Sequence, residues 1–200
     1  MKIIETPIYT IDELDEKARG AAREWWREGL NRGRWWDTLY EDFAGAATVL
    51  GVDITRRWRH WAIYFDLYGS SGSWVAFEGF LTNPPSPHFQ KVLRENYPTD
   101  KGLHKIGARL GALQKAHHGL LRARITSIPH GRMTVDVESS DHQPTFKQTE
   151  EVEALVRALA DWMQDRLRQE SDWQQADEQV DEALRANEYT FTADGKRFGG

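Results

Sequence analysis

The sequence predicts an α+β fold in which an antiparallel sheet of about five strands has helices packed on it, with a long acidic helix near the C-terminus. Three observations lead to this prediction. Two pairs of apolar runs are each separated by a short break that contains glycine, which is typical of β-hairpins. Several longer stretches carry apolar residues at helical spacing. Helices and hairpin-joined strands occur in mixed order, which favours an antiparallel sheet covered on one face by helices.

Length and composition set the limits of this fold. The 200 residues are 40% hydrophobic and 12% aromatic, enough for one domain with its own core. We expect a single domain over residues 1–188 and a turn or tail over residues 189–200. The chain has no cysteine, which excludes disulfides and zinc–sulfur sites. It shows neither an apolar run of membrane-helix length nor a signal peptide, so we expect a cytoplasmic protein.

The first part of the chain predicts one strand and two helices. Residues 2–10 favour a short strand that Pro7 restricts to a sheet edge. Thr10 and Glu13 have the spacing of a capping box, so a helix is expected to follow and to end near residues 29–33. A second helix is predicted over residues 35–50. The short turn between the two helices predicts an antiparallel pair.

The middle of the chain predicts strands at 52–58, 61–68 and 74–81. The last two read as a hairpin around GSSGS, where Gly69 and Gly72 can supply positive φ angles. We interpret this hairpin as the centre of the sheet. Two helices are expected next, one from Ser86 to about Asn96 and one from Thr99 or Asp100 to about residue 119.

The last part of the chain predicts a second hairpin and two more helices. LLRARITSI and RMTVDVES flank the turn PHG. A long helix is predicted from Thr149 to about Trp173, and another begins at Asp177. YTFTADGKRF closes the chain as a small turn or a frayed tail.

Charge is segregated along the sequence. Residues 150–188 hold twelve acidic and four basic side chains, whereas residues 101–135 hold seven basic side chains and no carboxylate. The two segments either neutralise each other within the fold or face different partners.

The nine tryptophans provide the main candidate contacts with a protein partner. Neighbouring tryptophans on a helix point about 100° apart, so one of each pair is expected to lie at a boundary, where large rings anchor interfaces. Packing inside the fold and self-association as a homodimer are the alternatives. The candidate protein-binding residues are Trp26, Trp35, Trp74, Glu170, Asp172, Asp177, Glu178 and Asp181.

The segment RRWRHW, residues 56–61, gives an alternative, nucleic-acid binding. Arginines interleaved with rings suit phosphate contact and base stacking, and they also suit cation–π packing at a sheet edge. The overall pI of about 5.8 and the lack of a known nucleic-acid-binding motif oppose this alternative. Its candidate residues are Arg56, Arg57, Arg59, Lys101, Lys105, Arg109, Arg122 and Arg124.

We predict no catalytic residue, no metal and no cofactor. The serines of GSSGS do not form a G-x-S-x-G elbow, and the chain has no P-loop. One group of ligand-type residues surrounds the second hairpin, but its spacing matches no established metal site. We expect these residues to be solvated: His130, Asp136, Glu138, Asp141 and His142. Glu78 lies between apolar strand residues and is expected to face solvent.

Three stretches resemble a family of small proteins encoded by phages and prophages and labelled "antitoxin of toxin–antitoxin stability system". They are IYTIDELDEKARGAAREWWREG, IYFDLYGSSGSWVAFEG and DEQVDEALRANEYTFTADG, with weaker similarity through HKIGARLGALQKAH. The chain departs from the family in the hairpin turn, where Ser71 and Ser73 replace an expected Gln and Asp. The resemblance implies an intracellular protein of a mobile element and implies no catalytic residue.

These observations together predict a non-enzymatic, phage-encoded protein that binds and blocks a protein of the host or of a mobile element. The class includes antitoxins and inhibitors of bacterial defence, such as anti-CRISPR proteins. The acidic helices from Thr149 to Glu188 are expected to cover a basic groove on the target, because charge complementarity orients and speeds docking.

Overall fold

The structure is a computed structural model that describes residues 5–70, 72–82, 85, 88–129, 131–140 and 143–199, except for the side chains of residues 31 and 32. Its contacts divide the chain into two compact units. Residues 1–35 and 169–200 form the first unit, and residues 36–168 form the second. This division differs from the single domain over 1–188 expected from the sequence, because the last residues pack with the first ones.

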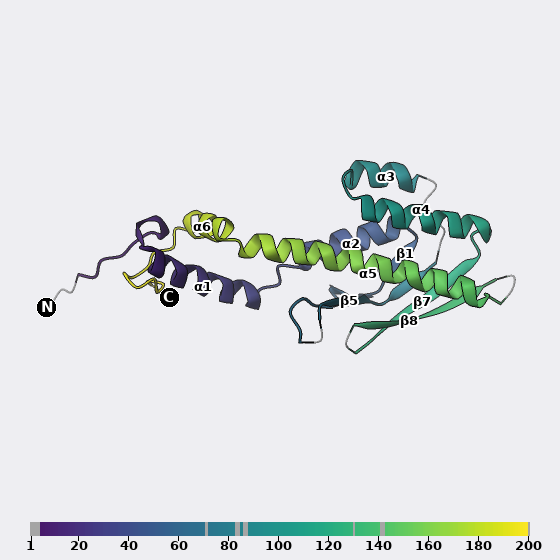
Figure 1. The fold of residues 1–200 in the computed structure, drawn as a ribbon, viewed down its shortest axis with the longest axis horizontal. Helices are drawn as coiled ribbons and strands as arrows, with labels where there is room; N and C mark the ends of the chain where they lie inside the picture. The colour runs from purple at the N-terminus through teal and green to yellow at the C-terminus, as the bar shows by residue number, and fades with distance from the viewer. Residues whose placement is uncertain are drawn as a thin grey trace. The chain divides into compact units, whose positions relative to one another are not determined.

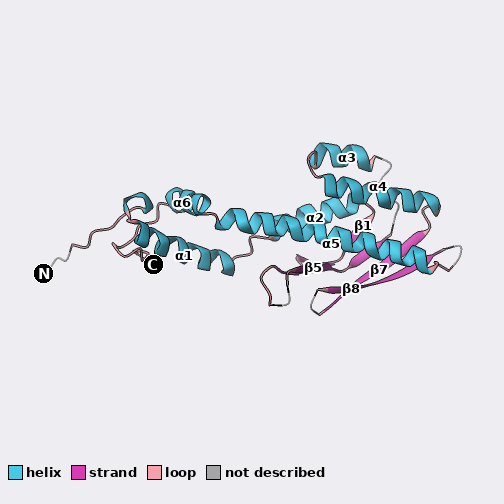
Figure 2. Ribbon diagram, in the orientation of Figure 1, coloured by secondary structure: helices cyan, strands magenta, loops and turns pink. Residues whose placement is uncertain are grey.

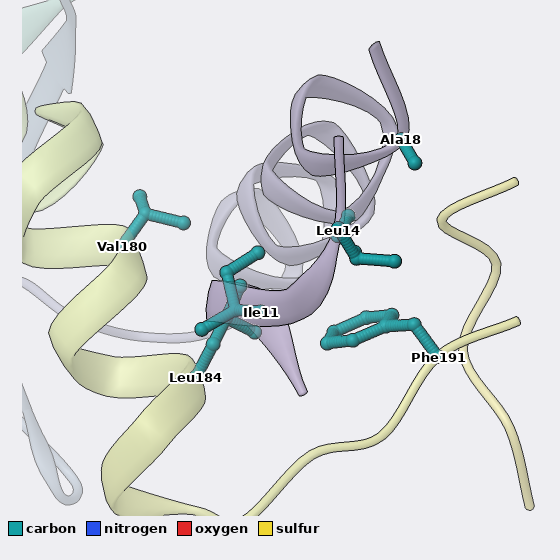
Figure 3. Close-up of a cluster of buried hydrophobic side chains, with 7 residues drawn as sticks. Ile11, Leu14, Ala18, Val180, Leu184 and Phe191 are labelled. Atoms are coloured by element: carbon teal, nitrogen blue, oxygen red, sulfur yellow. The ribbon is translucent and has the colours of Figure 1, made fainter. Parts of the chain in front are cut away.

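The first unit is built from the two ends of the chain. It contains the 3₁₀ turn η1 (Ile11–Glu13), α1 (Glu16–Arg32), the end of α5 (Phe146–Gln175), and α6 (Asp177–Ala186). Helices α1 and α6 are in contact, and their apolar side chains form one buried cluster with the C-terminal turn (Figure 3). The buried members of this cluster are Ile11, Leu14, Ala18, Ala22, Val180, Leu184 and Phe191.

Local hydrogen bonds define where these elements begin. The backbone N–H of Thr10 donates to the Glu13 carboxylate at 2.8 Å, as the capping box predicted. This box closes η1, however, and α1 begins only at Glu16, where Asp15 accepts the N–H of Ala18 at 2.8 Å. The C-terminal segment is a turn, and its Phe191 forms a bridge with Tyr9.

The second unit contains a four-stranded antiparallel sheet in the order β1-β6-β7-β8 (Figures 1 and 2). The strands are β1 (Val52–Ile54), β6 (Gly79–Leu81), β7 (Leu121–Ile128) and β8 (Arg132–Ser139). Leu81 pairs with both Val52 and Ala123, which sets the register across the three strands. The β7–β8 hairpin confirms the second hairpin of the sequence analysis.

Helices α2 (Asp37–Val49), α4 (Lys101–Ala116) and α5 pack on one face of this sheet. Val52 and Leu81 of the sheet meet Ile106 of α4 and Leu155 of α5 in the apolar interior. Asp100 caps α4 by accepting the N–H of Leu103 at 3.0 Å. The short α3 (Phe89–Asn96) contacts α4 and α2. The α+β class with a long C-terminal helix is therefore confirmed.

The opposite face of the sheet is exposed. Asp53, Phe80, Arg124 and Asp136 lie beside one another in register on β1, β6, β7 and β8, and all four are exposed. Their neighbours in each strand are buried, except Val137 on β8, which is half-buried. The alternation is that of an antiparallel sheet with one packed face and one open face.

Two small ribbons lie outside the four-stranded sheet. Strands β4 (Ile63–Asp66) and β5 (Trp74–Phe77) pair with each other, so the aromatic hairpin is a separate ribbon and not the sheet centre that we predicted. Only its continuation, β6, enters the sheet. Strands β2 (Arg56–Arg57) and β3 (His60–Trp61) form a second ribbon, because the chain reverses at residues 58–59 where a continuous strand was expected.

The predicted pairing of the first two helices and two predicted element starts are not found in the described residues. Helices α1 and α2 were predicted to pair, but they belong to different units, and α1 packs with α6 in its own unit. The expected strand over residues 2–10 is not formed in its described part, because residues 5–10 contain only an isolated bridge at Tyr9; residues 2–4 lie outside the described residues. The expected helix start at Ser86 also lies outside the described residues. Within the described residues, no helix combines the length and the apolar character needed to cross a bilayer.

Phe77 tests the core of the second unit, because its side chain is 0% exposed. We expect Phe77→Ala to lower the free energy of unfolding by about 3–5 kcal/mol, the cost of removing a buried ring. Phe80→Ala is the matched control, since Phe80 is 45% exposed and should lose about 1 kcal/mol or less. Urea unfolding followed by circular dichroism measures both. Equal losses in the two variants would contradict the assigned packing.

Candidate protein-binding site

An aromatic pocket of about 600 Å³ lies within the first unit. Trp25 and Trp26 on α1, Trp35 just after α1, and Tyr189 after α6 supply its rings, and we call this set the aromatic pocket. All four side chains are half-buried. The volume lies in the range of pockets that receive drug-sized molecules or side chains of a partner.

The rings of the pocket support one another. The Tyr189 ring lies edge-on to Trp25 with a centroid distance of 5.2 Å and is tilted against Trp26 at 5.8 Å. Phe191 packs edge-on to Trp25 at 6.1 Å from the buried side. Such geometries match the ring quadrupoles and add to the stabilisation from burial. The pocket wall is therefore preformed.

An ion-pair network fixes α1 against α6 within the same unit. The guanidinium of Arg23 donates to both carboxylate oxygens of Asp181, at 2.8 and 2.7 Å, and also to Asp177 at 2.7 Å. Arg27 donates to Asp177 and to the backbone oxygen of Gln175. Arg23 and Asp181 are only 9% and 8% exposed. Bidentate, charge-assisted bonds of this kind hold geometry well.

The network shifts the ionisation of its members. The hydrogen bonds from Arg23 hold the pKa of Asp181 below its usual value, and the charges of Arg23 and Arg185 act in the same direction. A similar bond from Arg185 lowers the pKa of the exposed Asp12, which ties η1 to α6. Both carboxylates therefore remain ionised at neutral pH.

The structure brings together two of the three tryptophans predicted as partner contacts. Trp26 and Trp35 line the same pocket, although they come from different parts of the chain's first segment. Trp74 lies in the second unit on β5, where its ring leaves no room for a side chain at Gly131. Trp74 thus has a packing role within its own unit.

The predicted acidic contacts fall into two classes. Asp181 is buried, and Asp177 bonds to two arginines of α1, so both serve to hold the first unit together; the expectation that Asp181 lies at a partner surface is wrong. Sequence spacing could not reveal this role because the arginines lie about 150 residues earlier. Asp172 and Glu178 are exposed, and Glu170 is half-buried and accepts a bond from Gln174.

The basic residues predicted for nucleic acid do not form one surface. Lys101, Lys105 and Arg109 lie on the exposed side of α4. Arg124 projects from the open face of the sheet, which is the face opposite to the helices. Arg122 is half-buried and donates to the backbone oxygens of Gly119 and Leu121 at 2.7 and 2.9 Å. The remaining three arginines lie in or beside the β2–β3 ribbon.

The β2–β3 ribbon ends in an exposed ring. Trp58 is 99% exposed and has a φ of 59°, a left-handed conformation that is uncommon for a large side chain. Arg56 lies over the Trp61 ring at 5.0 Å and near Glu41, and Arg57 bonds to Glu78 at 2.6 Å. Arg59 is exposed beside Trp58. The tip therefore presents a ring with a cation next to it.

Glu78 has a partner that sequence analysis did not identify. Its side chain is 17% exposed and accepts the bond from Arg57, so the expectation that it faces solvent is wrong. This bond and the charge of Glu78 raise the pKa of Arg57 above its usual value. The pair joins the β2–β3 ribbon to the segment between β5 and β6.

The group considered as metal ligands is only partly described. Asp136 and Glu138 are exposed on the open face of β8, whereas His130, Asp141 and His142 lie outside the described residues. Among the residues that the structure does describe, no three His, Cys, Asp or Glu side chains gather as a metal site would require.

A family model covers the whole of the second unit. Residues 35–177, more than two thirds of the chain, match a family described as Domain of unknown function (DUF8835). The chain belongs to the DUF8835 family. Trp25, Trp26 and Tyr189 lie outside the range matched by DUF8835, and Trp35 is its first residue. No curated protein and no solved structure matches the chain.

Sequence reasoning missed three members of the site. Trp25 was not among the candidate contacts, yet its ring borders the pocket beside that of Trp26. Tyr189 and Arg197 lie in the segment assigned to a turn or tail, where Arg197 stacks on Tyr189 at 4.8 Å. The signal available was the aromatic pattern of YTFTADGKRF, which is unusual for a frayed end.

The Arg23–Asp181 pair gives a prediction for stability. We expect Asp181→Asn to lower the free energy of unfolding of the first unit by about 3 kcal/mol at neutral pH, because the buried Arg23 charge loses its bidentate partner. The exposed neighbour Glu182 provides the control, and Glu182→Gln should change stability by about 0.5 kcal/mol or less. Urea unfolding followed by tryptophan fluorescence measures both.

The contribution of the Asp181 carboxylate to the free energy of unfolding depends on pH in one direction. The folded pKa of Asp181 lies below the unfolded value of about 3.9, so its contribution is fully present above that value and is lost as pH falls through the folded pKa. The stability difference between wild type and Asp181→Asn should therefore shrink below about pH 4. A difference that is constant from pH 7 to pH 3 would refute the role of the ionised carboxylate.

Proposed function

We propose that this chain is a non-enzymatic binding protein that docks on a protein target through the aromatic pocket of its first unit. The observation that carries the proposal is the gathering of Trp25, Trp26, Trp35 and Tyr189 around one hollow of about 600 Å³. Tryptophan and tyrosine are the residues that most often anchor protein interfaces. Half-buried rings with a preformed wall lose little conformational freedom on binding.

The chemistry of the pocket favours recognition over reaction. Of the lining residues that the structure describes, the titratable ones are Glu28, Arg34 and Tyr189, alongside apolar rings and backbone. The strongly bonded carboxylates of the unit, Asp177 and Asp181, form ion pairs with Arg23 of α1 and do not line the pocket. These two carboxylates therefore hold α1 and α6 together and are not available as reactive groups in the pocket.

The resemblance described above supports the class of target. Two of its three stretches, residues 8–29 and 177–195, supply α1, α6 and Tyr189 and so build the unit that carries the pocket. On this basis we assign the chain to a phage or prophage, acting inside the bacterial cell on a protein of the host or of a mobile element. An antitoxin and an inhibitor of a defence system both fit this class.

Capture of the target tests the proposal. Tagged wild-type protein should retain a specific protein from the lysate of a phage-susceptible bacterium, and Trp26→Ala with Trp35→Ala should reduce the amount retained by about tenfold, the usual effect of removing anchor rings. Trp173→Ala is the matched control, because Trp173 belongs to the same unit, is 56% exposed and does not line the pocket. Quantitative mass spectrometry compares the three samples.

Two results would count against docking at this pocket. One is a captured protein that all three samples retain equally. The other is that no protein is enriched at any salt concentration. Circular dichroism of each variant verifies that α1 is still folded, so that a loss of capture is not a loss of structure.

Trp58 favours a second candidate function, binding of single-stranded nucleic acid. A fully exposed ring held in a left-handed backbone conformation is an outlier of the kind that often marks a contact site. Stacking of a base on this ring would be joined by phosphate contacts from the adjacent Arg59. The acidic excess of the whole chain opposes this candidate.

Fluorescence anisotropy with labelled single-stranded DNA and RNA tests this second candidate. Trp58→Ala should weaken binding by about tenfold, within the usual range for loss of one stacked base. Tyr68→Ala is the control, since Tyr68 is 69% exposed in the same unit but lies away from RRWRHW in the sequence. Binding that is undetectable at low salt, or unaffected by Trp58→Ala, would dispose of the candidate.

A further inference from the structure

Two rings that line the aromatic pocket also contact a cation of the same chain. The guanidinium carbon of Arg197 lies 5.2 Å from the centre of the Trp25 ring and 4.8 Å from that of Tyr189. Arginine over the face of tryptophan or tyrosine within about 6 Å is attracted by the ring quadrupole. Arg197 is exposed, so the rings hold this charge in the presence of water.

The net negative charge of the first unit attracts cations, as the faces of its aromatic rings do. The sequence of the first unit contains fifteen acidic and ten basic side chains, whereas that of the second contains sixteen of each. The net charge of −5 is therefore confined to the unit that carries the pocket. Several of its arginines are paired internally, including Arg23, Arg27 and Arg185.

Local charges at the pocket are balanced. Glu28 and Arg34 both line it, so neither sign dominates at its edge. Selectivity for a cation must then come from the faces of Trp26 and Trp35 and from the acidic field of the unit, to which Glu28 contributes a carboxylate at the pocket itself. Clefts with low-dielectric walls focus such a field and increase the local concentration of oppositely charged groups.

We propose that the aromatic pocket receives an arginine or lysine side chain from a basic segment of the protein target. This inference rests on the proposed function and adds the chemistry of the contact. The guanidinium or ammonium group lies over the tryptophan faces, and the flanking basic residues of the segment are attracted by the acidic unit. Aromatic cages for cationic groups use the same physics.

A pair of matched peptides tests the inference on the full-length protein. The probe is a fluorescein-labelled peptide of alternating glycine and arginine, and its control replaces each arginine by citrulline, which keeps the shape and removes the charge. Anisotropy titration should show binding of the arginine peptide and binding of the citrulline peptide weaker by about tenfold or more. A proline-rich peptide of equal length is the third arm and should bind no better than the citrulline peptide.

Variants distinguish the pocket from general attraction to an acidic protein. Trp26→Leu should reduce the affinity for the arginine peptide by about tenfold, and Trp173→Leu should leave it unchanged. Because Trp26→Leu also removes packing against Tyr189, the surface variant Glu28→Gln provides a second measurement and should weaken binding by about twofold to threefold.

The outcomes separate this inference from the proposed function. Equal affinity for the arginine and citrulline peptides, or preference for the proline-rich peptide, overturns the cationic contact. If a target is nevertheless captured in a pocket-dependent way, the proposed function stands and only the chemistry assigned to the contact fails. If the arginine peptide binds through Trp26 but no target protein is captured, the pocket is a cation site and the proposed function fails.

Discussion

The buried pair of Arg23 and Asp181 is the interaction on which the candidate site depends. It joins α1 to α6 across 158 residues of sequence, and its two parallel bonds set the separation of the two helices. Tyr189 lies three residues after the end of α6, and its ring contacts both Trp25 and Trp26 of α1 while the helices are held at this separation. A buried ion pair is weak evidence of net stabilisation, but loss of one partner is costly, so the pair makes the arrangement specific.

Most of the pocket lies outside the range that the family model matches. The DUF8835 range covers the sheet, the helices packed on it and all of α5, whereas residues on both sides of that range supply most of the pocket. The second unit carries no net charge, and the first carries all of it. Shape and charge thus coincide in the same unit, which is the combination that orients a charged partner during docking.

Much of the fold could be predicted from the sequence because its signals are local. The apolar periodicity of α5, the cap at Asp100 and the β7–β8 hairpin each depend on residues within a few positions of one another.

The predictions were wrong where the structure depends on contacts between residues far apart in the sequence, or where a turn lacks the residues that usually mark one. The β2–β3 reversal has Trp58 and Arg59 at its turn, where glycine or asparagine would be expected, so RRWRHW gave no turn signal. The pairing of α1 with α6 depends on Arg23 and Asp177, whose distance in sequence no periodicity reports. For the same reason Trp26 and Trp35 could be proposed as contacts from sequence, but Tyr189 and Arg197 could not be placed beside them.

The indole N–H signals of the nine tryptophans report most directly on whether the aromatic pocket is the docking site. A ¹H–¹⁵N spectrum of the labelled protein, recorded with and without its purified target, follows each ring separately once the signals are assigned by substitution. The account predicts that the signals of Trp26 and Trp35 change most, while the buried Trp162 and the exposed Trp58 keep their positions. Changes confined to Trp58, with the pocket signals unaltered, would contradict it.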